Sequence, residues 1–217
     1  MRLSGALPEA LAPIVHVVED DASARTAIAR LLQAAGYAVR TFATAADFLE
    51  ALTPDVSGCA LLDLRLPGSN GLEVQEALKR AGDPLPVIFI TGHGRVADSV
   101  RAMKSGAVDF LSKSADGDEL LDAVARALAR SAAEHHRRTV ANDLRRRYDR
   151  LSPREREVFA HLISGQLNKQ VGFDLGISVQ TTKIHRHRVF AKLEADSIAH
   201  LVRIADALGI APLGSVR

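Results

Sequence analysis

The chain has no tryptophan and only one cysteine, and its 217 residues include two tyrosines and seven phenylalanines. The single cysteine, Cys59, excludes an intrachain disulfide and fits a reducing compartment. No apolar run is long enough to span a membrane. Pro8, Glu9 and Pro13 interrupt the N-terminal segment, which makes it a poor secretory signal. These absences predict a cytoplasmic protein without a membrane partner, beginning with a loose extension over residues 1–12.

The composition is that of a soluble globular protein, with 47% hydrophobic and 25% charged residues. The length allows one large domain or two small ones. The net charge of +2 conceals an asymmetry, because residues 1–136 carry 13 basic and 18 acidic side chains whereas residues 137–217 carry 15 and 8. This division suggests two domains, the second with a polyanionic partner. A solvated basic linker would produce much of the same asymmetry.

The first part of the chain alternates between short apolar runs and amphipathic stretches with helical spacing. Three apolar runs predict buried strands, the first of them rich in β-branched residues, and an alternating run over residues 37–42 and a last short run predict two more strands. Five further stretches predict helices. This alternation is typical of an α/β fold with a doubly wound parallel sheet of five strands. The predicted strands cover residues 14–19, 37–42, 59–64, 86–91 and 107–112, and the predicted helices cover 22–36, 44–52, 71–82, 95–106 and 116 onward.

Acidic residues stand where two of these strands end. Glu19, Asp20 and Asp21 follow the first strand, and Asp63 ends the third. The carboxyl ends of parallel strands form the ligand-binding edge of such a sheet, so we expect these carboxylates to lie close together. Carboxylates that repel one another and lack basic neighbours suit a hard divalent cation, Mg²⁺ first.

Two further polar residues stand at the same predicted edge. Thr91 ends the fourth strand and Lys113 follows the fifth. A carboxylate such as Asp63 beside Mg²⁺ can attack a phosphoryl donor, while a lysine screens the charge of the transferred group. For any one acid, a solvated loop residue is the better interpretation. For four residue types at four strand ends, it is the weaker one.

The segment over residues 132–150 contains neither glycine nor proline and is predicted to form a helical linker. Within and just after it, Val140, Leu144, Tyr148 and Leu151 recur at spacings of four, four and three, which gives a narrow apolar stripe. Either a seam with a partner helix or packing on the chain's own domain explains this stripe.

Residues 151–217 predict an all-α domain of four helices. Ser152 and Glu155 form a capping box with a proline at the first helical position, and glycines end the first and second helices. A short second helix, a tight turn at Gly176 and a third helix capped by Ser178 give a helix-turn-helix. The third helix has no acid and is crowded with basic side chains, which suit either DNA or a solvated surface: Lys183, His185, Arg186, His187, Arg188 and Lys192.

The motifs "VVEDD", "LLDLRLPGSNG", "FITGHG" and "AVDFLSK" resemble the receiver domain of two-component response regulators, which places such a domain over residues 13–131. The resemblance implies that Asp63 is the phosphoacceptor. It also implies an Mg²⁺ site made by Asp20, Asp63 and the backbone carbonyl of Arg65, with Glu19 acting through a water. The corresponding switch and phosphate-pairing residues are Thr91, Phe110 and Lys113.

One departure from the receiver pattern follows the lysine. Receivers usually carry a proline with a cis peptide bond after it, whereas Ser114 stands here. A trans bond is expected for a serine. The geometry of this loop and the response to phosphorylation are therefore open to alteration.

The stretch from Leu151 to Leu193, "LSPREREVFAHLISGQLNKQVGFDLGISVQTTKIHRHRVFAKL", is similar to the LuxR-type helix-turn-helix. Thr182 stands where valine is usual and Gly172 where alanine is usual, which predicts a scaffold helix less stable by up to ~1 kcal/mol. By this resemblance, the residues facing base edges are Lys183, Ile184 and His187. The phosphate contacts it implies are Asn168, Lys169, Thr181, Arg186 and Arg188.

Together the two resemblances indicate a response regulator of the FixJ/NarL type rather than an enzyme. They imply phosphorylation by a sensor histidine kinase, a homodimer in the phosphorylated state and binding to a quasi-palindromic site in double-stranded DNA, with RNA polymerase as a further candidate partner. A phosphohydrolase with an aspartyl nucleophile is the first alternative, but it commonly needs an acid where Arg65 stands. The second alternative is a regulator that acts without phosphorylation, for which Ser114 is the only hint.

Overall fold

The computed structural model describes residues 12–214 except 54–56, 83–84 and 93–95. The chain divides into two compact units, residues 1–136 and residues 137–217. Most of the predicted N-terminal extension (residues 1–12) lies outside the described residues, as does the predicted start of the helix at residue 95.

The first unit is built on a five-stranded sheet in which every pairing is parallel. Its strands run in the order β2-β1-β3-β6-β7, so the predicted doubly wound sheet is confirmed. The chain moves from β1 outward to β2 and then crosses to β3, which makes the gap between the carboxyl ends of β1 and β3 the point where ligands bind in such sheets. The strands are β1 (Ile14–Val18), β2 (Ala38–Phe42), β3 (Gly58–Asp63), β6 (Val87–Thr91) and β7 (Asp109–Ser112).

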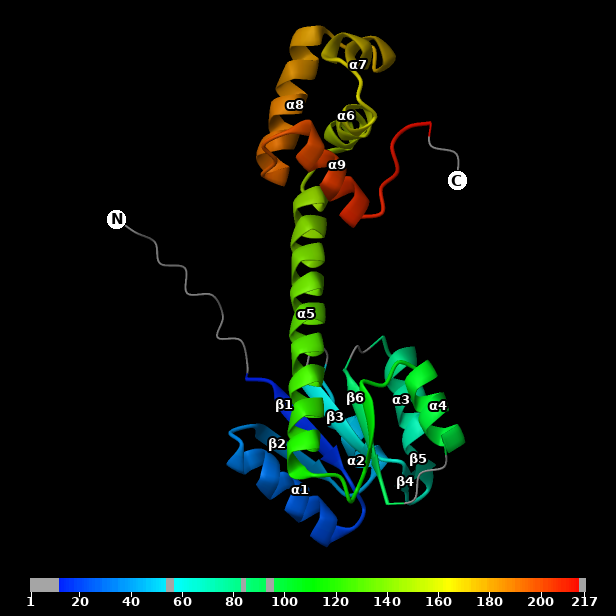
Figure 1. Ribbon diagram of the computed structural model, residues 1–217. Helices are drawn as coiled ribbons and strands as arrows, with labels where there is room; N and C mark the ends of the chain where they lie inside the picture. The colour runs from blue at the N-terminus through cyan, green and yellow to red at the C-terminus, as the bar shows by residue number, and fades with distance from the viewer. Residues whose placement is uncertain (1–11, 54–56, 83–84, 93–95, 215–217) are drawn as a thin grey trace, which may run out of the picture. The chain divides into compact units, whose positions relative to one another are not determined.

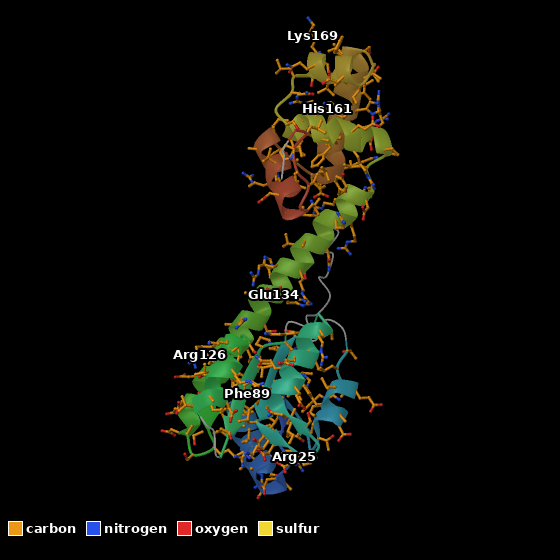
Figure 2. The ribbon with its side chains drawn as sticks, turned by 90° about the vertical axis from the view of Figure 1, so that its right-hand side faces the viewer. Arg25, Phe89, Arg126, Glu134, His161 and Lys169 are labelled. Atoms are coloured by element: carbon orange, nitrogen blue, oxygen red, sulfur yellow. The ribbon has the colours of Figure 1, made fainter. Side chains whose placement is uncertain are left out.

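Helices cover both faces of this sheet (Figure 1). Phe48 and Phe89 are fully buried in the core beneath α2, α3 and α4, whereas Leu32 and Ile88 are fully buried in the core beneath α1 and α5. Figure 2 shows Phe89 in the densely packed interior. The helices are α1 (Ala22–Ala34), α2 (Ala45–Glu50), α3 (Gly71–Arg80), α4 (Val96–Lys104) and α5 (Gly117–Asp149).

A small antiparallel hairpin that the apolar pattern does not predict follows the third strand. Its strands β4 (Arg65–Leu66) and β5 (Ser69–Asn70) are two residues each, and Gly68 takes a positive φ of 72° in the turn between them. Asn70 then caps α3 in a capping box with Glu73. The hairpin leads the chain directly from the end of β3 into α3.

Gly71, the first residue of α3, is required by close packing. A Cβ atom at this position would lie 2.6 Å from the backbone oxygen of Asp63 and 3.0 Å from the Phe89 ring. Any side chain would therefore push the start of α3 away from the end of β3. The glycine allows α3 to support the loop that carries Asp63.

The second unit is helical, as predicted. Ser152 caps α6 in a capping box with Glu155, and Ser178 caps α8 by accepting a hydrogen bond from the Thr181 amide. Val158, Phe159 and other residues with no exposed surface form its core. The helices are α6 (Pro153–Ile163), α7 (Asn168–Asp174), α8 (Val179–Leu193) and α9 (Ile198–Ala207).

The predicted linker is the C-terminal part of α5, a helix of 33 residues. Leu144, Tyr148 and Leu151 pack on the core of the second unit, and the Tyr148 ring lies 5.5 Å from the Phe159 ring. Val140 remains 44% exposed. Packing on the chain's own domain therefore explains three of the four stripe residues. No helix in the described ranges, α5 included, combines the length and apolarity needed to cross a bilayer.

The two departures in the helix-turn-helix are neighbours. A Cβ on Gly172 would lie 3.1 Å from Thr182 Oγ1 and 2.9 Å from the carbonyl oxygen of Ile177. The Thr182 hydroxyl donates a hydrogen bond to the carbonyl of Ser178, 3.1 Å away, and the residue is fully buried. Glycine at position 172 lowers the helix propensity of α7, but it allows α7 to approach the turn before α8 closely.

Candidate functional site

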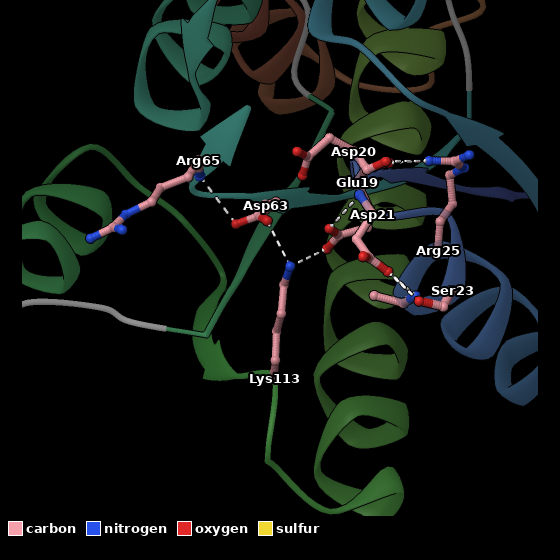
Figure 3. Close-up of polar contacts among 9 residues, drawn as sticks. Glu19, Asp20, Asp21, Ser23, Arg25, Asp63, Arg65 and Lys113 are labelled. Carbon is pink, nitrogen blue, oxygen red and sulfur yellow. Dashed lines mark hydrogen bonds and ion pairs between the residues drawn. The ribbon is translucent and has the colours of Figure 1, made fainter. Parts of the chain in front are cut away.

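Three of the carboxylates predicted to lie together do so at the sheet edge (Figure 3). One oxygen from each of Glu19, Asp20 and Asp63 lies within 4.8 Å of the others. Glu19 and Asp20 follow β1 and Asp63 ends β3, so the cluster occupies the point where the strand order reverses. Glu19 is fully buried, Asp63 is 5% exposed and Asp20 faces solvent. This oxygen set has the chemistry of a magnesium site.

The third acid of the run has another task. Asp21 is the N-cap of α1, and its Oδ1 accepts hydrogen bonds from the Ser23 hydroxyl at 2.6 Å and the Ala24 amide at 2.7 Å. These bonds lower the pKa of the Asp21 carboxyl. A carboxylate is also favoured at a helix N-terminus. Of the three consecutive acids, two therefore contribute to the cluster and one starts the helix.

Lys113 lies between two of the carboxylates. Its Nζ is 2.7 Å from Asp63 Oδ2 and 2.6 Å from Glu19 Oε2. Burial disfavours the ammonium, but the hydrogen bonds to Asp63 and Glu19 outweigh it and raise the lysine pKa. Burial is also the main cause that raises the pKa of Glu19, against the hydrogen bond from Lys113. The lysine thus supplies a fixed positive charge next to Asp63.

The serine in place of proline does not keep Lys113 from the acids. No cis peptide bond occurs among the described residues, so the Lys113–Ser114 bond is trans. The hydroxyls of Ser112 and Ser114 share a hydrogen bond of 2.7 Å, and the Ser114 amide donates to Ser112 Oγ at 3.2 Å. These bonds make a local turn immediately after β7.

Of the other residues expected at this edge, Arg65 contacts Asp63 directly, whereas Thr91 and Phe110 lie on the strands β6 and β7. The Arg65 amide donates to Asp63 Oδ1 at 3.1 Å, so both carboxylate oxygens have a partner. Thr91 is 4% exposed at the end of β6, and its carbonyl accepts a hydrogen bond from the Lys113 amide at 2.8 Å. Phe110 packs on the core beside Phe89, with ring centroids 6.1 Å apart.

A residue that the sequence patterns did not single out also contacts the acidic loop. Arg25 Nη1 donates hydrogen bonds to the backbone carbonyls of Glu19 at 2.6 Å and Asp20 at 3.0 Å. Its position one turn after the N-cap of α1 is the only signal in the sequence, since a side chain there can reach back over the preceding loop.

In the second unit, α8 presents a basic surface. Lys183, Ile184, His187 and Arg188 are exposed. Arg186 is half-buried, because its Nη1 donates to Asn168 Oδ1 at 3.1 Å and its guanidinium lies 5.4 Å from the centre of the Phe190 ring. An open hollow between α7 and α8 is lined by Asn168, Lys183, Arg186, His187 and Phe190.

Two further basic residues of this unit have different surroundings. Lys169 is exposed on α7 (Figure 2), whereas Lys192 turns inward. Lys192 Nζ lies 2.6 Å from Glu155 Oε2 and donates to the Arg150 carbonyl at 3.0 Å. Burial opposes ionisation of Glu155, but the bonds from Lys192 and the Ser152 amide outweigh it and lower the pKa of this carboxyl. Lys192 therefore belongs to the packing of the domain.

Thr181, expected as a phosphate contact, lies in the first turn of α8. Its hydroxyl is 2.8 Å from Ser178 Oγ, within the N-terminal cap of that helix. The helix N-terminus adds backbone amides and a partial positive charge at the same place. This end of α8 has the donors that a phosphate needs.

Comparison with known proteins matches each of the two parts of the chain to a family. Residues 15–125 match the response regulator receiver domain, and residues 149–211 match the bacterial regulatory proteins of the luxR family. Nodulation protein W of Bradyrhizobium diazoefficiens is 46% identical over 198 residues, which is 91% of this chain and 87% of that protein. The transcriptional regulatory protein FixJ of Azorhizobium caulinodans is 41% identical over 206 residues, covering 95% and 97% of the two chains.

Comparison with solved structures also matches the chain to response regulators. The response regulator StyR superposes with a TM-score of 0.83 at 41% identity, covering 90% of this chain and 98% of that one. Full-length FixJ from B. japonicum gives a TM-score of 0.56 at 38% identity, covering 91% and 97%. The chain belongs to the two-component response regulators that join a receiver domain to a LuxR-type DNA-binding domain. It is a transcription factor whose receiver implies a kinase partner, and its relatives are regulators rather than enzymes.

Proposed function

We propose that Asp63 accepts a phosphoryl group from a sensor histidine kinase and that this event controls DNA binding in the cytoplasm. The observation that carries the proposal is the position of Asp63 at the strand switch point, with two carboxylates and a lysine around it. Mg²⁺ would be held by Asp20, Asp63 and the Arg65 carbonyl, with Glu19 acting through a water. The ion would neutralise charge on the phosphoryl group in transit.

In the transfer, an oxygen of Asp63 attacks phosphorus, the P–N bond to the kinase histidine breaks, and the histidine leaves with the electron pair of that bond. Lys113 then moves from the carboxylate to a phosphoryl oxygen, which carries more negative charge. The hydroxyl of Thr91 donates a hydrogen bond to another phosphoryl oxygen, and Phe110 moves inward behind it. The separation of Lys113 from Glu19 and Asp63 is the change that phosphorylation would impose on this edge.

The surface beside this edge supports a phosphorylation-dependent homodimer. Val96, Val100 and Met103 of α4 are 80%, 45% and 47% exposed, which is unusual for large apolar side chains on one short helix. Asp109 of β7 forms an ion pair with Arg126 of α5 on the adjoining surface. A partner copy that covers α4 would remove the apolar stripe from water.

In such a dimer, two copies of α8 would enter successive major grooves of a quasi-palindromic site. Lys183, Ile184 and His187 would face base edges. The phosphate contacts would be Asn168, Lys169, Thr181, Arg186 and Arg188, of which Arg186 is already held in place by Asn168 and Phe190. RNA polymerase would be contacted from the DNA-bound dimer.

The test is the Asp63→Asn variant of the full chain, treated with a small phosphodonor and Mg²⁺. Wild type is expected to gain mass by light scattering and to bind its DNA site more tightly, whereas Asp63→Asn does neither. Asp47→Asn, an exposed carboxylate on α2, is the matched control and should respond like wild type. A regulator that works without phosphorylation would bind DNA equally in all three proteins.

A further inference from the structure

Arg25 holds the backbone of the loop that carries two of the clustered carboxylates. It is half-buried in the first turn of α1. Its Nη1 bridges the carbonyl oxygens of Glu19 and Asp20, at 2.6 Å and 3.0 Å (Figure 3). Hydrogen bonds from a charged donor are about twice as strong as neutral ones. One guanidinium nitrogen thus fixes two consecutive peptide groups.

The same loop is attached at other points. The Glu19 amide donates to the Phe42 carbonyl of β2 at 3.1 Å. The Asp21 amide donates to Glu19 Oε1 at 3.2 Å, and the Asp21 carboxylate caps α1. Without Arg25, the Glu19 and Asp20 carbonyls would lose the donor that ties them to α1. The peptide between Glu19 and Asp20 would then lose its only side-chain tie to α1, and the peptide between Asp20 and Asp21 would keep only the bond from its amide to Glu19 Oε1. The exposed Asp20 carboxylate would be held less firmly as a result.

We infer that Arg25 is a positioning residue for the divalent-cation site, which it serves by fixing the backbone that aims the Asp20 and Glu19 carboxylates. It touches neither the metal nor the phosphoryl group in this role. The inference rests on the proposed function, because it presumes that Mg²⁺ binds at Glu19, Asp20 and Asp63. Groups that orient metal ligands from outside typically change metal affinity by about 10- to 100-fold when replaced.

A role through charge alone would have the opposite sign. A guanidinium next to a cation site repels Mg²⁺, so neutralising Arg25 would strengthen binding if its charge were what mattered. Loss of positioning weakens binding instead. The direction of the change in Mg²⁺ affinity therefore separates the two roles.

The experiment measures Mg²⁺ binding to the full chain by isothermal titration calorimetry, for wild type, Arg25→Gln, Arg25→Lys and Arg30→Gln. Arg25→Gln is expected to bind Mg²⁺ about tenfold more weakly. Arg25→Lys retains a charged donor and should lose less. Arg30→Gln removes an equal charge from an exposed position on the same helix and should stay within about twofold of wild type.

A second measurement follows phosphorylation by acetyl phosphate as Mg²⁺ is raised. Arg25→Gln should need about tenfold more Mg²⁺ for half-maximal rate and should approach the wild-type rate at saturation, since Asp63 and Lys113 are unchanged. Circular dichroism checks that the variants are folded. If Arg25→Gln does not fold, Arg25→Lys decides the question through its smaller shift in Mg²⁺ affinity.

The possible outcomes distinguish a failure of the inference about Arg25 from a failure of the proposed function. If wild type neither binds Mg²⁺ nor accepts phosphate, the proposed function fails. If wild type does both and Arg25→Gln binds Mg²⁺ as well as wild type or more tightly, Arg25 does not position the site. An equal loss in Arg25→Gln and Arg30→Gln would also overturn the inference, because the hydrogen bonds that only Arg25 makes to the loop could not then be the cause.

Discussion

The buried pair of Lys192 and Glu155 gives a prediction about the stability of the second unit. Lys192→Met keeps most of the aliphatic stem but leaves the Glu155 carboxylate, which is 2% exposed, without its cation. Removing one partner of a buried ion pair typically costs about 3–5 kcal/mol. The Lys192 side chain is 32% exposed, so water screens the pair and we expect a loss of ~2–3 kcal/mol.

Because the chain has few aromatic residues, tyrosine fluorescence can be used to measure the unfolding of the second unit. The sequence has no tryptophan and two tyrosines, Tyr37 in the first unit and Tyr148 against Phe159 in the second. In a Tyr37→Phe background, tyrosine fluorescence reports unfolding of the second unit alone. With a urea m-value of about 1 kcal/mol/M, the midpoint should fall by about 2–3 M.

The stability that the Lys192–Glu155 pair gives to the second unit should depend on pH in a definite direction. The pKa of Glu155 is lowered in the folded protein, so in wild type its contribution is present above the unfolded pKa of about 4.3 and is lost as pH falls through the folded value. In Lys192→Met, burial without a cation raises that pKa instead. The stability difference between the two proteins should therefore be largest at pH 7 and narrow towards pH 4.

Two further variants complete this test. Glu155→Gln with Lys192→Met removes the buried charge but keeps a capping side chain at N3, and should regain most of the lost stability. Arg188→Met, which removes an exposed cation from the same helix, should change the midpoint little. If Lys192→Met unfolds at the same urea concentration as the Arg188 control, the pair does not support the domain and the reasoning is refuted.

Lys183→Ala should cost ~1–3 kcal/mol of binding free energy on the specific DNA site and much less on random DNA. Arg188→Ala should weaken binding to both DNAs equally and flatten the slope of log affinity against log salt by about one unit. Fluorescence anisotropy across a salt series measures both, and an equal loss on both DNAs for Lys183→Ala would make it a phosphate contact. Glu194 has a left-handed φ of 52° and an ion pair with Arg147 at 2.9 Å. Since the strain costs about 1–2 kcal/mol and an exposed pair contributes ~0.2–1, Glu194→Gly should raise the free energy of unfolding by about 0.5 kcal/mol in the same urea assay, and a clear loss would contradict this.

Apolar periodicity was sufficient to predict the sheet and its helices. Buried parallel strands read as continuous apolar runs, and β3 and β6 are buried along their whole length. The sequence of the edge strand β2 alternates instead, but its burial follows this alternation only in part, because Arg40 and Thr41 are both exposed. The hairpin of β4 and β5 was not predicted, because strands of two residues leave no periodic signal in the sequence.

From the sequence, the acids could be placed at one edge of the sheet, but the separate role of each acid could not be assigned. Asp20 and Asp21 have the same side chain, and only the start of α1 decides that the second one caps a helix. Lys192 has the same ambiguity, because a basic residue on a basic helix looks like a DNA contact until the direction of its side chain is known. Its partner, Glu155, is 37 residues away in the chain.

The long helix α5 contributes residues to two different hydrophobic cores. Ala123, Val124, Ala127 and Ser131 are buried at its N-terminal end, and Leu144 and Tyr148 pack near its C-terminal end, but none of residues 132–143 is buried. An isolated helix of that length is marginal in water, so the two packed ends nucleate the turns between them. The middle of α5 should consequently exchange its amide hydrogens faster than either end, as a short helix–coil equilibrium bounded by two folded segments.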